Sequence, residues 1–108
     1  MDLIATLQRC FAADRVLYSR HARDEMRYEE FGAISDVEVG EAIANATLVE
    51  EYPDDTPYPS ALLLGRTSTE RPLHIVCAYA EVVDRTVVVT VYQPDPERWD
   101  DELRRRKS

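Results

Sequence analysis

Two apolar segments near the C-terminus constrain the fold more than any other part of the chain. Residues 72–81 and 85–93 are rich in valine, isoleucine and tyrosine, which favour strands. Only a few residues separate them, and so short a connection joins antiparallel neighbours. The two segments are therefore predicted to form a hairpin in an antiparallel sheet.

The alternation of side chains along a strand decides which residues of the hairpin share a face. One register places only apolar side chains on the face toward the helices: Ile75, Cys77, Val89 and Val91. The same register puts His74 almost opposite Tyr92 on the other face, together with Thr90. A register of the other parity would mix polar and apolar residues on both faces, so we reject it.

Helix signals dominate the first half of the chain. Apolar residues recur at helical spacing over 3–13, and Ser19 is a suitable cap for a second helix over 20–30. Ser35-Asp36-Val37-Glu38 has the pattern of a capping box, which predicts a third helix ending near Asn45. Between the first two, Val16-Leu17-Tyr18 is either an edge strand or an extended connector.

The remaining elements complete an α+β pattern. Strands are predicted over 48–52 and 60–66, on either side of a loop with three prolines, and a short charged helix carrying Trp99 and Leu103 closes the chain. Helices followed by a meander indicate α+β. We expect one domain, residues 1–108, with N-terminal helices packed on one side of a three- to four-stranded antiparallel sheet.

Composition limits the classes of function. No apolar run approaches the length of a membrane span and no leader segment is visible, so a cytoplasmic protein is expected. Cys10 and Cys77 form no metal or redox motif, and buried, reduced thiols are expected. The net charge of −8 argues against a general nucleic-acid binder. Positive charge gathers in two places only: the stripe Arg20, Arg23 and Arg27, and the tail from Arg104 to Lys107.

The predicted hairpin places chemically useful groups together. His74, Tyr92 and Thr90 share one face, and Arg71 stands just outside the strand, so an imidazole, a phenol and a cation are available for acid–base chemistry. The alternative is that His74 and Tyr92 form a structural hydrogen-bonded pair. No metal or cofactor motif is present, although His21 shares a helical face with Glu25.

Short segments along the chain, taken together and in order, resemble those of a known family. They are His21-Ala22 with Met26, Asp36-Val37, Glu50-Glu51-Tyr52-Pro53, Pro57-Tyr58-Pro59-Ser60, Leu64-Gly65, Arg71-Pro72-Leu73-His74-Ile75-Val76, Thr90-Val91-Tyr92 with Pro94, and Trp99. Together, over about residues 18–107, they resemble domain-of-unknown-function family four-two-five-eight. Members of that family resemble the RelE/ParE toxin superfamily, which implies a RelE-like α+β fold.

The resemblance also implies a function and a partner. It implies a toxin of a bacterial toxin–antitoxin pair, encoded beside a small zinc-finger antitoxin, and a metal-independent ribonuclease activity. In this reading His74 acts as acid or base and Tyr92 handles a proton or stacks on a base. Phosphate is held by Arg71, by His21 or by the arginine stripe, with Thr90 alongside. The alternative is a non-catalytic module that binds the zinc-finger protein through the basic tail and the proline-rich loop.

Overall fold

Three helices and five strands make up the protein, which a computed structural model describes over residues 2–100 and 102–105. The helices are α1 (Leu3–Ala12), α2 (Arg20–Tyr28) and α3 (Asp36–Ala44). The strands are β1 (Val16–Tyr18), β2 (Thr47–Tyr52), β3 (Ser60–Arg66), β4 (Pro72–Ala80) and β5 (Arg85–Tyr92), with a short 3₁₀ turn, η1 (Glu81–Val83), between the last two. The predicted α+β class is confirmed.

Each helix begins at a polar residue that accepts a backbone hydrogen bond. Asp2, Ser19 and Ser35 accept from the third backbone N–H that follows each of them. At α3 the bond is reciprocal, because Glu38 in turn accepts from the backbone N–H of Ser35. The predicted capping box is therefore confirmed, and so are the three helices.

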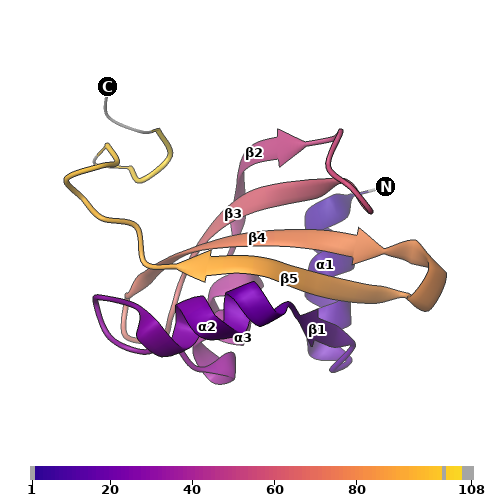
Figure 1. Cartoon of the computed structure of the whole chain (residues 1–108), viewed down its shortest axis with the longest axis horizontal. Helices are drawn as coiled ribbons and strands as arrows, with labels where there is room; N and C mark the ends of the chain where they lie inside the picture. Colours follow the sequence, from indigo (N-terminus) through magenta and orange to yellow (C-terminus); the bar gives the residue numbers. More distant parts are fainter. Residues whose placement is uncertain (1, 101, 106–108) are drawn as a thin grey trace.

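The sheet differs from the predicted antiparallel meander of three or four strands. Its order is β1-β5-β4-β3-β2, and β1 pairs with β5 in the parallel direction (Figure 1). The first strand can lie beside the last because α2 and α3 carry the chain across the sheet to the far edge, where β2 begins. Val16-Leu17-Tyr18 is thus an edge strand, and the sheet is mixed with five strands.

The central hairpin has the predicted register at one end only. His74 lies opposite Tyr92 and Ile75 opposite Val91, as expected. A bulge follows, so that Cys77 pairs with Val88. The prediction that Val89 joins the core was therefore wrong: the extra residue in β5 turns Val88 into the core and leaves Val89 half-buried.

Two apolar clusters lie on opposite faces of the sheet. The larger one joins all three helices to residues of β3, β4 and β5, including Leu63, Ile75 and Val91. The smaller one lies on the other face, where Leu62 contacts Trp99 and Leu103 of the C-terminal segment. Both faces are therefore covered, one by helices and one by the segment after β5.

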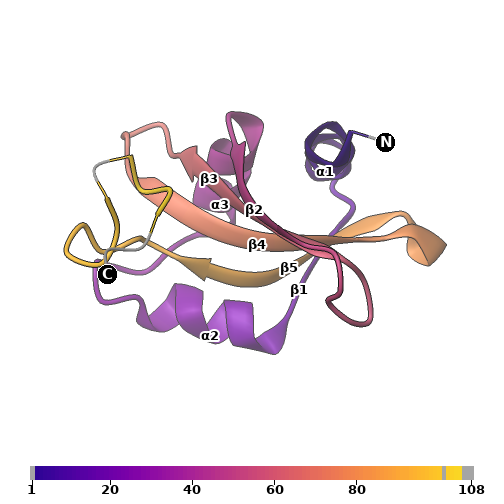
Figure 2. The same ribbon diagram turned by 90° about the horizontal axis from the view of Figure 1, so that it is seen from above.

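That C-terminal segment is not the predicted helix. Residues 95–99 form one turn, in which the backbone N–H groups of Arg98 and Trp99 both donate to the carbonyl of Asp95, and none of the described residues after β5 continues it as an α-helix. Leu103 has a φ of 59°, which lies outside the helical region. Contacts with the sheet thus override a weak local preference. The segment lies beyond the arrowhead of β5, at the end of the molecule opposite the β4–β5 turn (Figures 1 and 2).

Candidate functional site

His74 lies on the sheet face beneath the C-terminal segment, and its side chain is completely buried. Its Nε2 is 2.6 Å from the carbonyl oxygen of Leu103, and its Nδ1 is 3.1 Å from the hydroxyl oxygen of Tyr92. A carbonyl can only accept, so Nε2 carries the hydrogen, and in the neutral ring Nδ1 accepts from the Tyr92 hydroxyl. The Trp99 ring packs edge-on against the imidazole, with 4.4 Å between centroids.

The structure thus brings together three of the site residues singled out in the sequence and adds two more from the C-terminal segment. His74 and Tyr92 meet across the hairpin, and the half-buried Thr90 follows on the same face. Trp99 and Leu103 cover them. The signal for this cover was in the sequence, because Trp99 and Leu103 are the only large apolar residues in a charged C-terminal stretch.

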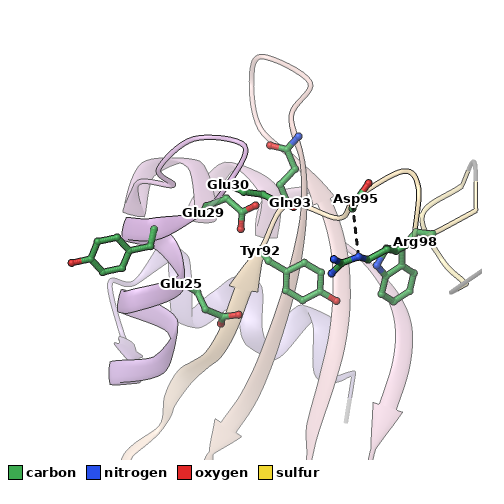
Figure 3. A pocket seen from close by; sticks show the side chains of 9 residues that line it. Glu25, Glu29, Glu30, Tyr92, Gln93, Asp95 and Arg98 are labelled. Atoms are coloured by element: carbon green, nitrogen blue, oxygen red, sulfur yellow. Dashed lines mark ion pairs between the residues drawn. The ribbon is translucent and has the colours of Figure 1, made fainter.

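Tyr92 and Trp99 also form a wall between two clefts. The first, of about 350 Å³, lies between the end of α2 and the C-terminal segment. Figure 3 shows Glu25, Glu29 and Glu30 on its α2 side, Asp95 and Arg98 on its other side, and Tyr92 between them. The second cleft, of about 340 Å³, is lined by residues of the sheet face and the tail: Glu50, Tyr52, Leu62, Val76, Arg104 and Arg105.

The first cleft contains a carboxylate held by the edge of the sheet. β1 pairs with β5 only as far as Val88, and beyond that point the backbone N–H of Val91 donates to Glu25 Oε1 at 3.2 Å. Burial raises the pKa of Glu25 above its usual value, and the hydrogen bond from Val91 and the nearby His21 offset this only in part. His21 itself is largely exposed and lies 3.1 Å from Glu25 Oε1.

Arg71 is engaged with protein groups rather than turned toward His74. Its Nε donates to Gln93 Oε1 at 2.6 Å, and its Nη1 to the carbonyl of Ala33 at 3.0 Å and to Glu38 Oε2 at 3.2 Å. Its Nη2 donates to the carbonyl of Gly32. Burial pushes the pKa of Glu38 upward, but hydrogen bonds from Ser35 and Arg71 outweigh it and leave that pKa below its usual value. Arg71 therefore fixes the α2–α3 loop to β4.

The arginine stripe of α2 is divided among separate surroundings. Arg23 forms an ion pair with Asp36, and its guanidinium carbon lies 3.9 Å from the centre of the Tyr18 ring. Arg27 lies 5.9 Å from the ring centre of Tyr28, and Arg20 is exposed. In the tail, Arg104 donates to the hydroxyl of Thr47 and to the carbonyl of Leu48, at the edge of the sheet. Arg106 and Lys107 lie outside the described residues.

Among the described residues there is no group of His, Cys, Asp and Glu side chains placed to hold a metal ion. No described helix has the length and apolar character needed to cross a membrane. The features that the structure does define are a small α+β domain, a mixed five-stranded sheet and two clefts that share an aromatic wall.

The chain belongs to the family described as Domain of unknown function (DUF4258), which matches residues 18–93. The matched part begins at the end of β1 and ends directly after β5. Both α1 and the segment that covers His74 thus lie outside it. No curated protein and no solved structure matches the chain.

Proposed function

We propose that this protein is a partner-binding module of a toxin–antitoxin pair, which complexes a small protein and performs no chemistry of its own. One observation favours a binding role over catalysis: His74, the residue best suited to acid–base catalysis, is completely buried and has both ring nitrogens in hydrogen bonds to the protein. A catalytic base has to reach the proton that it removes. In this arrangement the imidazole holds the C-terminal segment on the sheet.

The electrostatics support binding a protein over binding RNA. The net charge is −8, and the first cleft is lined by carboxylates. Phosphate contacts supply most of the affinity of RNA-binding proteins, whereas Arg71 already spends its donors on Gln93, Glu38 and two carbonyls. The resemblance to RelE/ParE toxins and their zinc-finger antitoxins supplies the class of partner that we propose.

Co-expression tests this function. The chain and the small protein encoded beside it are produced together and separated by size exclusion, with each protein run alone for comparison. We expect the two to elute as one complex. Separate elution of two folded proteins would refute partner binding.

Metal-independent RNA cleavage is a second candidate, favoured by the position of Tyr92. Its hydroxyl donates to His74 Nδ1, and its ring lines both clefts. A ribose 2′-hydroxyl would attack the phosphorus and expel the 5′-oxygen, which takes a proton from water. The 2′ proton would pass to Tyr92 as the Tyr92 proton moves to His74. Arg105, in the second cleft, would face the phosphate charge.

RNA incubated with the pure protein in EDTA tests this second function. Cleavage that is lost in Tyr92→Phe, a variant that keeps the aromatic ring, would support it. Intact RNA, together with normal growth when the chain is induced alone, would rule it out.

A further inference from the structure

A groove runs from α2 to the C-terminal segment, and its walls carry exposed aromatic rings. It consists of the first cleft and an adjoining hollow of about 370 Å³, which share Glu30 and Asp95. Tyr28 and Phe31 border it, with exposed fractions of 74% and 44%. Large apolar side chains exposed together along a groove are typical of a binding surface. We call this the aromatic groove.

The charge lining the aromatic groove is strongly one-sided. Five carboxylates line it: Glu25, Glu29, Glu30, Asp95 and Glu97. The only cation among the described lining residues is Arg98, whose Nε lies 3.8 Å from Asp95 Oδ2. The groove thus already accommodates one guanidinium, next to Asp95 and the aromatic wall (Figure 3).

Two of these carboxylates are placed against the local electrostatics of the fold. Glu29 and Glu30 directly follow α2, at the end where the helix dipole is negative. Carboxylates there oppose the dipole, and cations are favoured. No described residue pairs with either carboxylate. Their position costs stability, and a bound cation would recover it.

We propose that the aromatic groove binds a basic segment of a protein partner, in which lysine or arginine residues alternate with apolar ones. The cations would face Glu29, Glu30 and Asp95, and the apolar side chains would lie against Tyr28 and Phe31. This inference rests on the proposed partner-binding function and names the surface and the chemistry of the partner. A nucleic acid is not the occupant, because its phosphates would meet the same carboxylates.

A peptide titration tests the groove. The probe is a short synthetic peptide of alternating arginine and leucine, with a glutamate–leucine peptide of equal length as its counterpart. Trp99 is the only tryptophan in the chain and lines the first cleft, so its fluorescence reports occupancy. We expect the basic peptide to bind, the acidic one not to bind, and the affinity to fall with added salt.

Matched variants separate the groove from the overall charge. The double variant Glu29→Gln/Glu30→Gln is expected to weaken binding of the basic peptide about tenfold or more. The control variant Asp54→Asn/Glu81→Gln also removes two negative charges, but at exposed sites outside the groove. It should change the affinity for the basic peptide less than about threefold. Tyr28→Ala should also weaken binding, whereas Val82→Ala, at an exposed apolar residue elsewhere, should not.

Thermal stability distinguishes a binding role from a structural one. Because Glu29 and Glu30 oppose the helix dipole, their replacement should leave the melting temperature unchanged or raise it while binding is lost. Equal weakening by both charge variants would overturn the groove as the site. The groove would also be overturned as the site if the Glu29→Gln/Glu30→Gln variant formed an unchanged complex with the small protein encoded beside the chain. That result would leave the proposed function standing. Failure of the wild type to form that complex would refute the function itself.

Discussion

The Nε2 of His74 lies 2.6 Å from the carbonyl oxygen of Leu103, and this buried hydrogen bond joins the central hairpin to a segment without regular secondary structure. Leu103 reaches this position with a φ of 59°, a conformation that costs a non-glycine residue about 1–2 kcal/mol. Burial of its side chain against Leu62, together with the bond to His74, offsets that cost. The imidazole is therefore one of the groups that hold the C-terminal segment on the sheet, together with Trp99 and Arg104.

Replacement of His74 should destabilise the protein strongly. We expect His74→Ala to lower the free energy of unfolding by about 2–4 kcal/mol, because it leaves a cavity and a buried carbonyl without its donor. Tyr92→Phe should cost about 1 kcal/mol. Urea denaturation measures both. The exposed His21 is the matched control, and His21→Ala should stay within about 0.5 kcal/mol. Equal stability of the two histidine variants would contradict the anchoring role.

Two glycines should respond in opposite directions to the same substitution. A Cβ on Gly65 of β3 would lie 1.9 Å from the carbonyl oxygen of Ala42 in α3, so Gly65→Ala must push helix and sheet apart. We expect a loss of about 2–4 kcal/mol. A Cβ on Gly40, inside α3, meets no atom within 4 Å, and Gly40→Ala should stabilise the protein by about 0.5–1 kcal/mol. Thermal denaturation of both variants compares the two directions.

Asp84 should make the protein sensitive to acid. Hydrogen bonds from Arg9 and Tyr79 hold the pKa of Asp84 at about 2, against an ordinary value of 3.8. A carboxyl group with a lowered pKa in the folded state stabilises the protein above its unfolded pKa, and this contribution is lost as the pH falls. The wild type should therefore lose stability between about pH 4 and pH 2.

Asp84→Asn isolates that contribution. Asparagine tolerates the left-handed conformation of residue 84, whose φ is 49°, but carries no charge. The variant should be less stable than the wild type at pH 7, and the difference should shrink below pH 4. Denaturant midpoints across this range measure the gap, with Asp54→Asn at an exposed position as control. A constant difference at every pH would argue against the ion pair.

The two cysteines should be unreactive in the folded protein. Cys10 and Cys77 are free and fully buried, and burial raises the pKa of the Cys77 thiol far above its usual value. Because the thiolate is the reactive form, a thiol reagent should label both residues slowly in buffer and rapidly in denaturant. Rapid labelling of the native protein would show that one of them is accessible.

Local patterns were sufficient to predict most elements of the fold. Ser35 with Glu38 determined where α3 begins, and the alternation in β4 and β5 placed His74 opposite Tyr92. These predictions succeeded because they depend on neighbours in sequence or on one short hairpin. The expected register failed beyond Val76, where a bulge inserts Val89, because both adjacent residues of β5 are valines and the pattern does not choose between Val88 and Val89.

The candidate site was predicted less completely, because its parts come from distant segments. The spacing of His21 and Glu25 indicated a shared helical face, but not that Glu25 would accept a hydrogen bond from β5. Arg71 was expected to be available as a phosphate ligand, because no residue near it in the sequence indicates that it donates hydrogen bonds to Gly32, Glu38 and Gln93. Such contacts depend on how loops return to the sheet.

By itself, the sequence determined the α+β class, the three helices, the order of the strands from β2 to β5 and the pairing of His74 with Tyr92. Caps, hydrophobic periods and short turns act over a few residues, which is why these features could be predicted. Only the tertiary structure decided that β1 lies parallel to β5 and that the described residues after β5, up to 100 and from 102 to 105, do not form the predicted helix. Both outcomes depend on contacts between segments that are far apart in the sequence. β1 extends the edge of the sheet at β5, and Trp99 with Leu103 covers the second face of the sheet, where His74 is buried.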